Sequence, residues 1–140
     1  KLNNWREIYQ SKLTTANEAI KFIHDGDKVV TGFGCGEPFG IERALVENYE
    51  NYHDVEIISM LTLGDSPWCR PEMKGHFKLN CLFASQSNRK AISLGVSEFT
   101  TSHFYEIPDL IKNYHRRMNT DMFLLVQRLI TRVELPITAT

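Results

Sequence analysis

Short, mostly apolar runs recur along the chain, separated by stretches with the spacing of amphipathic helices. Four such runs, at 28–33, 55–60, 77–84 and 121–127, predict β-strands, and the segment 99–105 also has the pattern of an extended chain. The run at 121–127 is almost continuously apolar, which is typical of a strand buried on both faces of a parallel sheet. The pattern therefore favours a sheet that is covered on both sides.

Helix signals fill the intervals between the predicted strands. Thr15 and Glu18 have the spacing of a capping box, in which the Thr15 hydroxyl accepts a hydrogen bond from the Glu18 amide and the Glu18 side chain reaches back. Gly26 is expected to end this helix in the left-handed conformation. Three further helices are predicted: one with Ile41, Ala44 and Leu45 on its inner face, one over 88–94 between a Ser87 cap and a Gly95 stop, and one from Pro108 to about His115.

The alternation of strands and helices indicates the fold class. Helical patterns of about 10–15 residues between strands imply βαβ units, and therefore an α/β fold with a mostly parallel sheet flanked by helices. In such sheets ligands bind beyond the carboxyl ends of the strands. The segments 34–38, 61–66 and 84–87 each follow a predicted strand, so we expect them at one common edge.

Length and composition fit one globular domain. The chain has 140 residues, 42% of them hydrophobic, with 16 basic and 17 acidic side chains and a formal net charge of −1. This balance gives no electrostatic argument for binding nucleic acid, and no apolar run approaches the ~20 residues of a membrane-spanning helix. The three cysteines, Cys35, Cys69 and Cys81, leave one unpaired in any scheme, which favours a reduced, cytoplasmic setting.

A glycine-rich turn is the strongest local feature. Gly32, Gly34 and Gly36 alternate with other residues, which lets the backbone approach a ligand without Cβ hindrance, and free amides before a helix can hold an anion. The spacing matches neither a dinucleotide-binding fingerprint nor a P-loop, and Cys35 lacks the flanking glycines of a nucleophile elbow. A plain, tight strand-to-helix turn is the alternative interpretation.

Two kinds of chemistry are considered for the cysteines. Cys35 lies near a helix start, where a thiolate is stabilised, although a small residue that fills the turn explains it as well. Cys69, His76 and Cys81 have spacings that match no standard structural zinc site, so we expect no metal site here. His76 is expected to be a loop or packing residue.

Charged side chains near the predicted edge leave several interpretations open. Glu37 is either a ligand contact or general base, or else a solvated turn carboxylate or a partner of Arg43. The basic cluster at 115–117 can meet phosphates, although a solvated loop end explains it too. The pair at 89–90 opens a helix closer to the ligand edge, and a surface position is its default interpretation.

Seven short segments then follow one another in an order and spacing that are informative together: 26–30, 34–38, 44–47, 55–57, 71–77, 89–92 and 104–108. Over residues 4–127 they resemble the opening of the acetyl-CoA hydrolase/transferase family. Within that family the resemblance is to 4-hydroxybutyrate CoA-transferases and to related butyrate or acetate CoA-transferases. The segment 4–127 is thus predicted to be an incomplete CoA-transferase N-terminal domain.

The resemblance implies a two-domain enzyme with similar α/β halves, of which this chain is like the first. In the family, a glutamate attacks the acyl-CoA thioester, and a mixed anhydride and then a glutamyl-CoA thioester follow. That glutamate belongs to the second half, so the resemblance implies no catalytic residue in this chain, Glu37 included. Coenzyme A esters are implied as substrates rather than as a permanently bound cofactor, and no metal is implied.

The resemblance further implies that this half lines the acyl and carboxylate side of a cleft between domains. Asn88 and Arg89 are expected at its rim. The positions expected to line the wall are Gly34, Gly36, Glu37, Pro38, Thr62, Gly64, Ser85 and Ser87.

The chain departs from the family pattern at its end. After residue 127 the family usually continues with Val-Ser-Pro-Pro-Asp and a His-Gly pair, whereas residues 128–136 here read Arg-Leu-Ile-Thr-Arg-Val-Glu-Leu-Pro. We interpret 128–140 as a frameshifted or truncated tail, with true divergence as the alternative. A domain that lacks its second half is expected to expose the apolar surface meant for that half.

Three functional hypotheses follow. The first is the N-terminal domain of an acyl-CoA:carboxylate CoA-transferase for acetate, butyrate or 4-hydroxybutyrate, with a C-terminal half supplied separately and homo-oligomers expected. The second is a non-catalytic module that binds a small acid or a CoA ester, because fold does not fix function. The third is an inert, truncated fragment.

Overall fold

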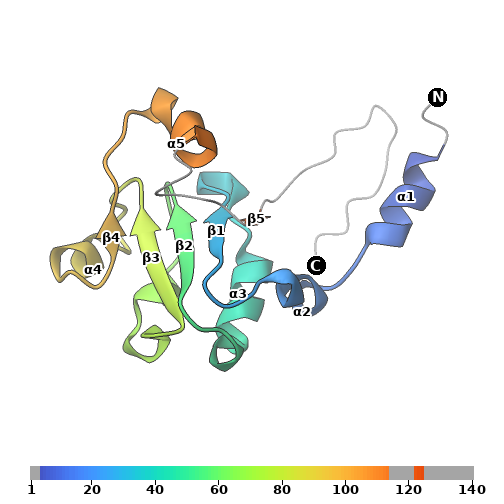
Figure 1. The fold of residues 1–140 in the computed structure, drawn as a ribbon, viewed down its shortest axis with the longest axis horizontal. Helices are drawn as coiled ribbons and strands as arrows, with labels where there is room; N and C mark the ends of the chain where they lie inside the picture. Colours follow the sequence, from blue (N-terminus) through green and yellow to red (C-terminus); the bar gives the residue numbers. More distant parts are fainter. Residues whose placement is uncertain (1–3, 114–121, 125–140) are drawn as a thin grey trace.

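Five parallel strands form a single sheet in the order β4-β3-β2-β1-β5 (Figure 1). The computed structural model describes residues 4–113 and 122–124. The predicted α/β class with a mostly parallel sheet is confirmed. The strands are β1 (Lys28–Thr31), β2 (Val55–Ser59), β3 (Phe77–Cys81), β4 (Glu98–Phe99) and β5 (Met122–Leu124).

Helices lie on both sides of this sheet, and the first one stands apart from it (Figure 1). No helix among residues 4–113 is long and apolar enough to cross a bilayer. The α-helices are α1 (Trp5–Lys12), α2 (Ala16–Ala19), α3 (Phe39–Glu47), α4 (Arg89–Ser93) and α5 (Ile107–Asn113). Short 3₁₀ turns occupy Ile20–Phe22, Gly34–Gly36, Tyr49–Asn51, Pro67–Cys69, Pro71–Met73 and Phe104–Glu106.

Alternate residues of the central strands enter two separate cores, because side chains along a strand point to opposite faces. Val29 and Ile57 belong to the larger core, which α3 covers. Val30 and Ile58 belong to a smaller core on the other face, which α5 covers. Burial on both faces explains why these strands read as continuous apolar runs in the sequence.

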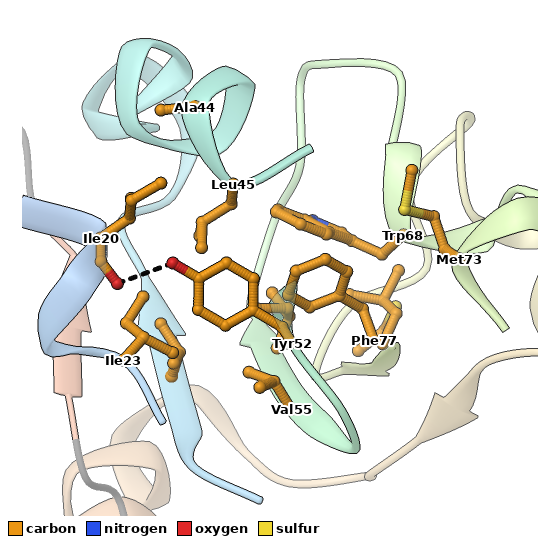
Figure 2. Close-up of a cluster of buried hydrophobic side chains, with 13 residues drawn as sticks. Ile20, Ile23, Ala44, Leu45, Tyr52, Val55, Trp68, Met73 and Phe77 are labelled. Carbon is orange, nitrogen blue, oxygen red and sulfur yellow. Dashed lines mark hydrogen bonds between the residues drawn. The ribbon is translucent and has the colours of Figure 1, made fainter. Parts of the chain in front are cut away.

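The larger core contains one buried polar anchor. The Tyr52 hydroxyl donates a hydrogen bond to the Ile20 carbonyl oxygen at 2.9 Å (Figure 2). Trp68 and Phe77 pack edge to face beside it, with ring centroids 5.0 Å apart. This core fixes the 3₁₀ turn at Ile20–Phe22 and the loop after β2 against the sheet.

Several predicted ends and caps are confirmed. The Thr15 hydroxyl accepts a hydrogen bond from the Glu18 amide at 3.2 Å, but the Glu18 carboxylate pairs with Lys21 at 2.7 Å instead of reaching back. Gly95 has a φ of +68° and follows Leu94, the C-cap of α4, so it is the predicted left-handed stop. Gly26 has a φ of +80°, but the prediction that it ends the first helix was wrong, because that helix ends in the 3₁₀ turn at Ile20–Phe22 with Ile23 as its C-cap. The α-helix after Thr15 is shorter than predicted, because it tightens into a 3₁₀ turn after Ala19.

Other predicted boundaries were wrong or lie outside the described residues. The strands predicted at 28–33 and 77–84 end earlier, at Thr31 and Cys81. After β1 the chain turns so that the Gly34 amide bonds the Leu61 carbonyl oxygen in the loop after β2. In the predicted extended segment 99–105, only Phe99 is in a strand, and a 3₁₀ turn begins at Phe104. Pro108 does lie in the first turn of α5, and the helix end predicted near His115 is outside the described residues.

Candidate functional site

Three loops follow β1, β2 and β3 at the carboxyl edge of the sheet, as the sequence predicted for 34–38, 61–66 and 84–87. The first two loops are joined by a hydrogen bond from the Gly34 amide to the Leu61 carbonyl oxygen at 2.9 Å. Gly34 has a φ of +56°, a left-handed conformation that glycine adopts without strain. The glycine-rich segment is therefore a tight turn that brings two strand ends together.

A buried carboxylate strengthens this link. Glu37 is only 4% exposed, and its Oε2 accepts hydrogen bonds from the backbone amides of Leu63 at 2.8 Å and Gly64 at 3.2 Å. Hydrogen bonds to an ionised carboxylate are stronger than neutral ones. The interpretation of Glu37 as a solvated turn residue was wrong, and no ion pair joins it to Arg43 among the described residues.

Gly64 is packed closely against the same carboxylate. A Cβ at this position would lie 2.8 Å from Phe39 Cε1 and 3.4 Å from Glu37 Oε1. The first distance is shorter than van der Waals contact, so any larger residue would have to displace the Phe39 ring. Glycine lets the loop after β2 approach the start of α3.

Hydroxyl groups connect the second and third loops. The Ser66 and Ser87 hydroxyl oxygens are 2.8 Å apart, and those of Ser85 and Ser87 are 3.1 Å apart. Ser59 and Thr62 form a separate hydroxyl pair at 2.8 Å. The hydroxyls predicted to line a cleft are therefore engaged with other hydroxyls. Sequence reasoning missed Ser66, which has a left-handed φ of +48° and is almost fully buried.

Asn88 stabilises the third loop through a buried side-chain hydrogen bond. It is the N-cap of α4, and its Oδ1 accepts a hydrogen bond from the Ser85 amide at 2.8 Å. The predicted Ser87 cap was wrong, because the Ser87 hydroxyl is engaged with Ser66 and Ser85. Asn88 is buried and not at a rim, whereas Arg89 is exposed, as expected.

The eight predicted wall residues thus belong to three interlinked loops. Cross-loop hydrogen bonds fix these loops relative to one another, so the three loops form one hydrogen-bonded unit at this edge. Gly34, Gly36 and Gly64 are partly exposed, Ser87 is exposed, and Glu37, Pro38, Thr62 and Ser85 are buried.

A second buried carboxyl group, Glu42, escaped the sequence analysis. It lies on α3 and is 6% exposed. Burial and, secondly, the negative charge of Glu37 raise the pKa of Glu42 from 4.5 to about 7. One signal was available: position 42 precedes buried Leu45 by three residues and therefore lies near the inner face of the helix.

Large apolar side chains lie exposed around these loops. Phe33, Leu63 and Phe83 lie in the segments that follow β1, β2 and β3. Phe39 begins α3, and Phe104 packs edge to face on Phe33 with centroids 6.5 Å apart. Each of the five is roughly half exposed or more, and we call this set the apolar rim. Clustered exposed apolar side chains are typical of interaction surfaces.

Cys69, Cys81 and His76 behave as packing residues. His76 Nδ1 hydrogen-bonds the Tyr52 carbonyl oxygen at 2.7 Å, which confirms the packing role. Burial, followed by the nearby Cys81, raises the pKa of the Cys69 thiol to about 11. Within the described ranges, no group of three His, Cys, Asp or Glu side chains is placed to hold a metal ion. Cys35 is exposed.

The basic residues add little to the site as described. The pair at 89–90 is exposed at the start of α4, as expected for surface residues. The cluster at 115–117 lies outside the described residues.

The parallel sheet, the hydrogen-bonded loops at its carboxyl edge and the apolar rim define an α/β domain. The family follows from comparison with known proteins. A sequence profile described as "Acetyl-CoA hydrolase/transferase N-terminal domain" matches residues 1–132, and the chain belongs to this family. The match runs past position 127, and the tail boundary predicted there stays a prediction.

Curated relatives are CoA-transferases. The 4-hydroxybutyrate coenzyme A transferase of Clostridium kluyveri is 36% identical over 121 residues, which are 86% of this chain and 28% of that protein. The butyryl-CoA:acetate CoA-transferase of Anaerostipes caccae is 30% identical over 118 residues, 79% of this chain and 25% of that protein. The chain spans roughly a quarter of the length of these relatives.

Solved structures support the fold. RipA from Yersinia pestis superposes with a TM-score of 0.72 at 24% identity, over 86% of this chain and 30% of that chain. A 4-hydroxybutyrate CoA-transferase from Porphyromonas gingivalis superposes with a TM-score of 0.63 at 24% identity, over 86% of this chain and 26% of that chain. These likenesses establish the fold of the domain.

Proposed function

We propose that this chain supplies the carboxylate-side wall of an acyl-CoA:carboxylate CoA-transferase that acts on short acids such as acetate, butyrate or 4-hydroxybutyrate. The observation that carries the proposal is the family match over residues 1–132. The printed activities of the relatives supply the substrate class, with CoA esters as substrates and not as a resident cofactor.

In the proposed reaction, a glutamate of the C-terminal half attacks the acyl-CoA carbonyl carbon, the CoA thiolate leaves, and a mixed anhydride forms. The thiolate then attacks the glutamyl carbonyl carbon, which releases the first carboxylate and leaves a glutamyl-CoA thioester. A second carboxylate repeats these steps in reverse, so that it leaves as an acyl-CoA and the glutamate is free again. In each step one bond to a carbonyl carbon breaks and another forms at the same carbon.

The part assigned to this chain is positioning. Gly34 and Gly36 are partly exposed and carry no Cβ, so their backbone can lie close to a small acid. The exposed Ser87 hydroxyl offers a further polar contact. Glu37 is engaged with two backbone amides, which supports a role in holding the wall rather than in attacking a thioester.

The apolar rim is the proposed contact with the C-terminal half. Leu63 and Phe104 are 62% and 70% exposed, which is unusual for side chains of their size next to a hydrogen-bonded site. The relatives are roughly four times as long as the matched segment, so they contain the chain that covers such a surface. Homo-oligomers of the assembled protein belong to the same proposal.

The test is CoA transfer from butyryl-CoA to acetate. Three samples are assayed: the 140-residue chain alone, the chain mixed with the separately expressed remainder of the C. kluyveri transferase, and, as the control, that remainder alone. Activity only in the mixture supports the proposal. Activity of the chain alone would show that the chain contains its own nucleophile, and would refute the proposal that the nucleophile lies in the C-terminal half.

An inactive mixture in which the two parts nevertheless co-elute contradicts the proposal. In that case the thermal stability of the chain with and without butyryl-CoA decides between the two other hypotheses. A ligand-dependent rise in the melting temperature supports a binding module, because a ligand that binds only the folded state stabilises it. No rise supports an inert fragment.

A further inference from the structure

We infer that Glu37 and Glu42 form a proton-linked latch on the loop after β2, in which Glu37 holds the loop and the proton on Glu42 keeps that hold firm. Glu37 is thus assigned as a positioning residue of the wall. This inference stands on the geometry of the chain and does not rest on the proposed function.

The holding contact is direct. Glu37 stands between β1 and α3, yet its carboxylate binds the amides of Leu63 and Gly64, 26 and 27 residues away in the sequence. Two amide donors on one carboxylate oxygen are a strong arrangement only while that carboxylate keeps its charge and position. The contact therefore sets the place of the loop and of Leu63 on the apolar rim.

Glu42 is the group that perturbs this contact. Glu37 and Glu42 are 4% and 6% exposed, and the Glu42 amide bonds the carbonyl oxygen of Pro38, the residue after Glu37, at 3.0 Å. The two residues therefore lie together at the start of α3, where the charge of Glu37 acts on Glu42. Two ionised carboxylates in one buried place repel each other strongly, so the arrangement with a proton on Glu42 is the stable one. Protonated Glu42 leaves Glu37 as the single charge facing the two amides.

Charged groups on the neighbouring elements do not relieve this repulsion. Arg43 and Glu47 on α3 are exposed to solvent. Lys21 on the adjoining 3₁₀ turn pairs with Glu18 of α2 at 2.7 Å, and both of these side chains are also exposed. In the loop after β2, Asp65 is exposed. Among the described residues, Glu37 is the charge that acts on Glu42.

The strength with which the loop after β2 is held is expected to fall as the pH rises. The pKa of Glu42 is raised to about 7, so this group loses its proton near neutral pH. A second buried negative charge then weakens the bonds from Glu37 to the two amides. We expect the loop after β2 to be held firmly below this pH and more loosely above it.

The test follows the Leu63 and Gly64 amide resonances of the 140-residue chain by NMR from about pH 5.5 to 8.5. In the wild type, both amide protons should shift upfield and lose exchange protection with a midpoint near 7. In Glu42→Gln, both should stay constant. The matched control Glu47→Gln removes an exposed carboxylate from the same helix and should titrate like the wild type.

A second variant separates the two roles. In Glu37→Gln, protection of both amides should be lower at every pH, and the Glu42 side chain should titrate below the wild-type midpoint, because one of the two causes of its raised pKa is gone. Amides that do not titrate in the wild type, or that titrate equally in Glu42→Gln, overturn the inference. If a variant fails to fold, the chemical shift of the Glu42 carboxyl carbon is followed against pH in the wild-type protein. A titration midpoint near the ordinary pKa of 4.5 refutes the latch.

Discussion

Replacing Glu42 by glutamine is expected to stabilise the fold at alkaline pH and to leave it unchanged at acidic pH. In the unfolded chain Glu42 loses its proton near 4.5, whereas in the folded chain it keeps the proton up to about 7. Between these values the folded state binds more protons than the unfolded state, so stability falls as pH rises. Glutamine keeps the shape of the protonated side chain and cannot ionise.

The size of the effect follows from the same two values. A rise in pKa from 4.5 to about 7 corresponds to about 3 kcal/mol of unfolding free energy above pH 7. Solvent reaches part of the site and screens the charges, so we expect Glu42→Gln to gain about 1–3 kcal/mol at pH 8 over the wild type. At about pH 4, below the pKa of Glu42 in the unfolded chain, the unfolding free energies of Glu42→Gln and the wild type should differ by less than about 0.5 kcal/mol.

Urea unfolding followed by circular dichroism at both pH values measures this difference. Glu47→Gln, an exposed change of the same charge on the same helix, serves as the control and should shift stability by less than about 0.5 kcal/mol at either pH. The reasoning is refuted by a Glu42→Gln gain that is equal at both pH values, or by a loss of stability at pH 8.

Two further predictions concern the core and the turns. Tyr52→Phe removes a buried hydrogen bond to the Ile20 carbonyl oxygen, which keeps its bond from the Ile23 amide at 3.0 Å, so urea unfolding should show a loss of about 0.5–1.5 kcal/mol with an unchanged m-value; no loss would contradict a stabilising role of the Tyr52 hydroxyl. Gly26→Ala forces alanine into a φ of +80° and should cost about 1 kcal/mol or more. Gly40→Ala is the matched change in helix α3, where a Cβ meets open space, and it should stabilise by up to about 1 kcal/mol. Equal effects at the two glycines would contradict the conformational argument.

The sequence was sufficient for the layout of the site because that layout depends on local signals. Apolar runs at β1, β2 and β3 identify parallel strands, and parallel strands place the loops that follow them at one edge. Gly95 was recognisable as a helix stop because glycine takes the left-handed conformation at low cost. These inferences need no knowledge of what lies across the fold.

The contacts within the site were beyond sequence reasoning because they join residues far apart in the chain. Glu37 bonds to amides in another loop, so neither its burial nor its partners can be read from its neighbours. Ser87 resembled a helix cap until Ser66 was found beside it, 21 residues earlier. Glu42 has a charged side chain and lies near the edge of an apolar helix face, where solvent exposure is the usual expectation.

The place of β5 in the sheet has a consequence for the order in which the chain can fold during synthesis. β1 lies between β2 and β5, so its outer edge has no partner until Met122–Leu124 has left the ribosome. Those residues follow β1 by about 90 positions, which at roughly 5–20 residues per second amounts to about 5–20 seconds. During that interval Val29 and Val30 present an unpaired, apolar strand edge, which is a template for pairing with another nascent chain. The timing of the last strand therefore sets how long the nascent domain needs protection from its neighbours.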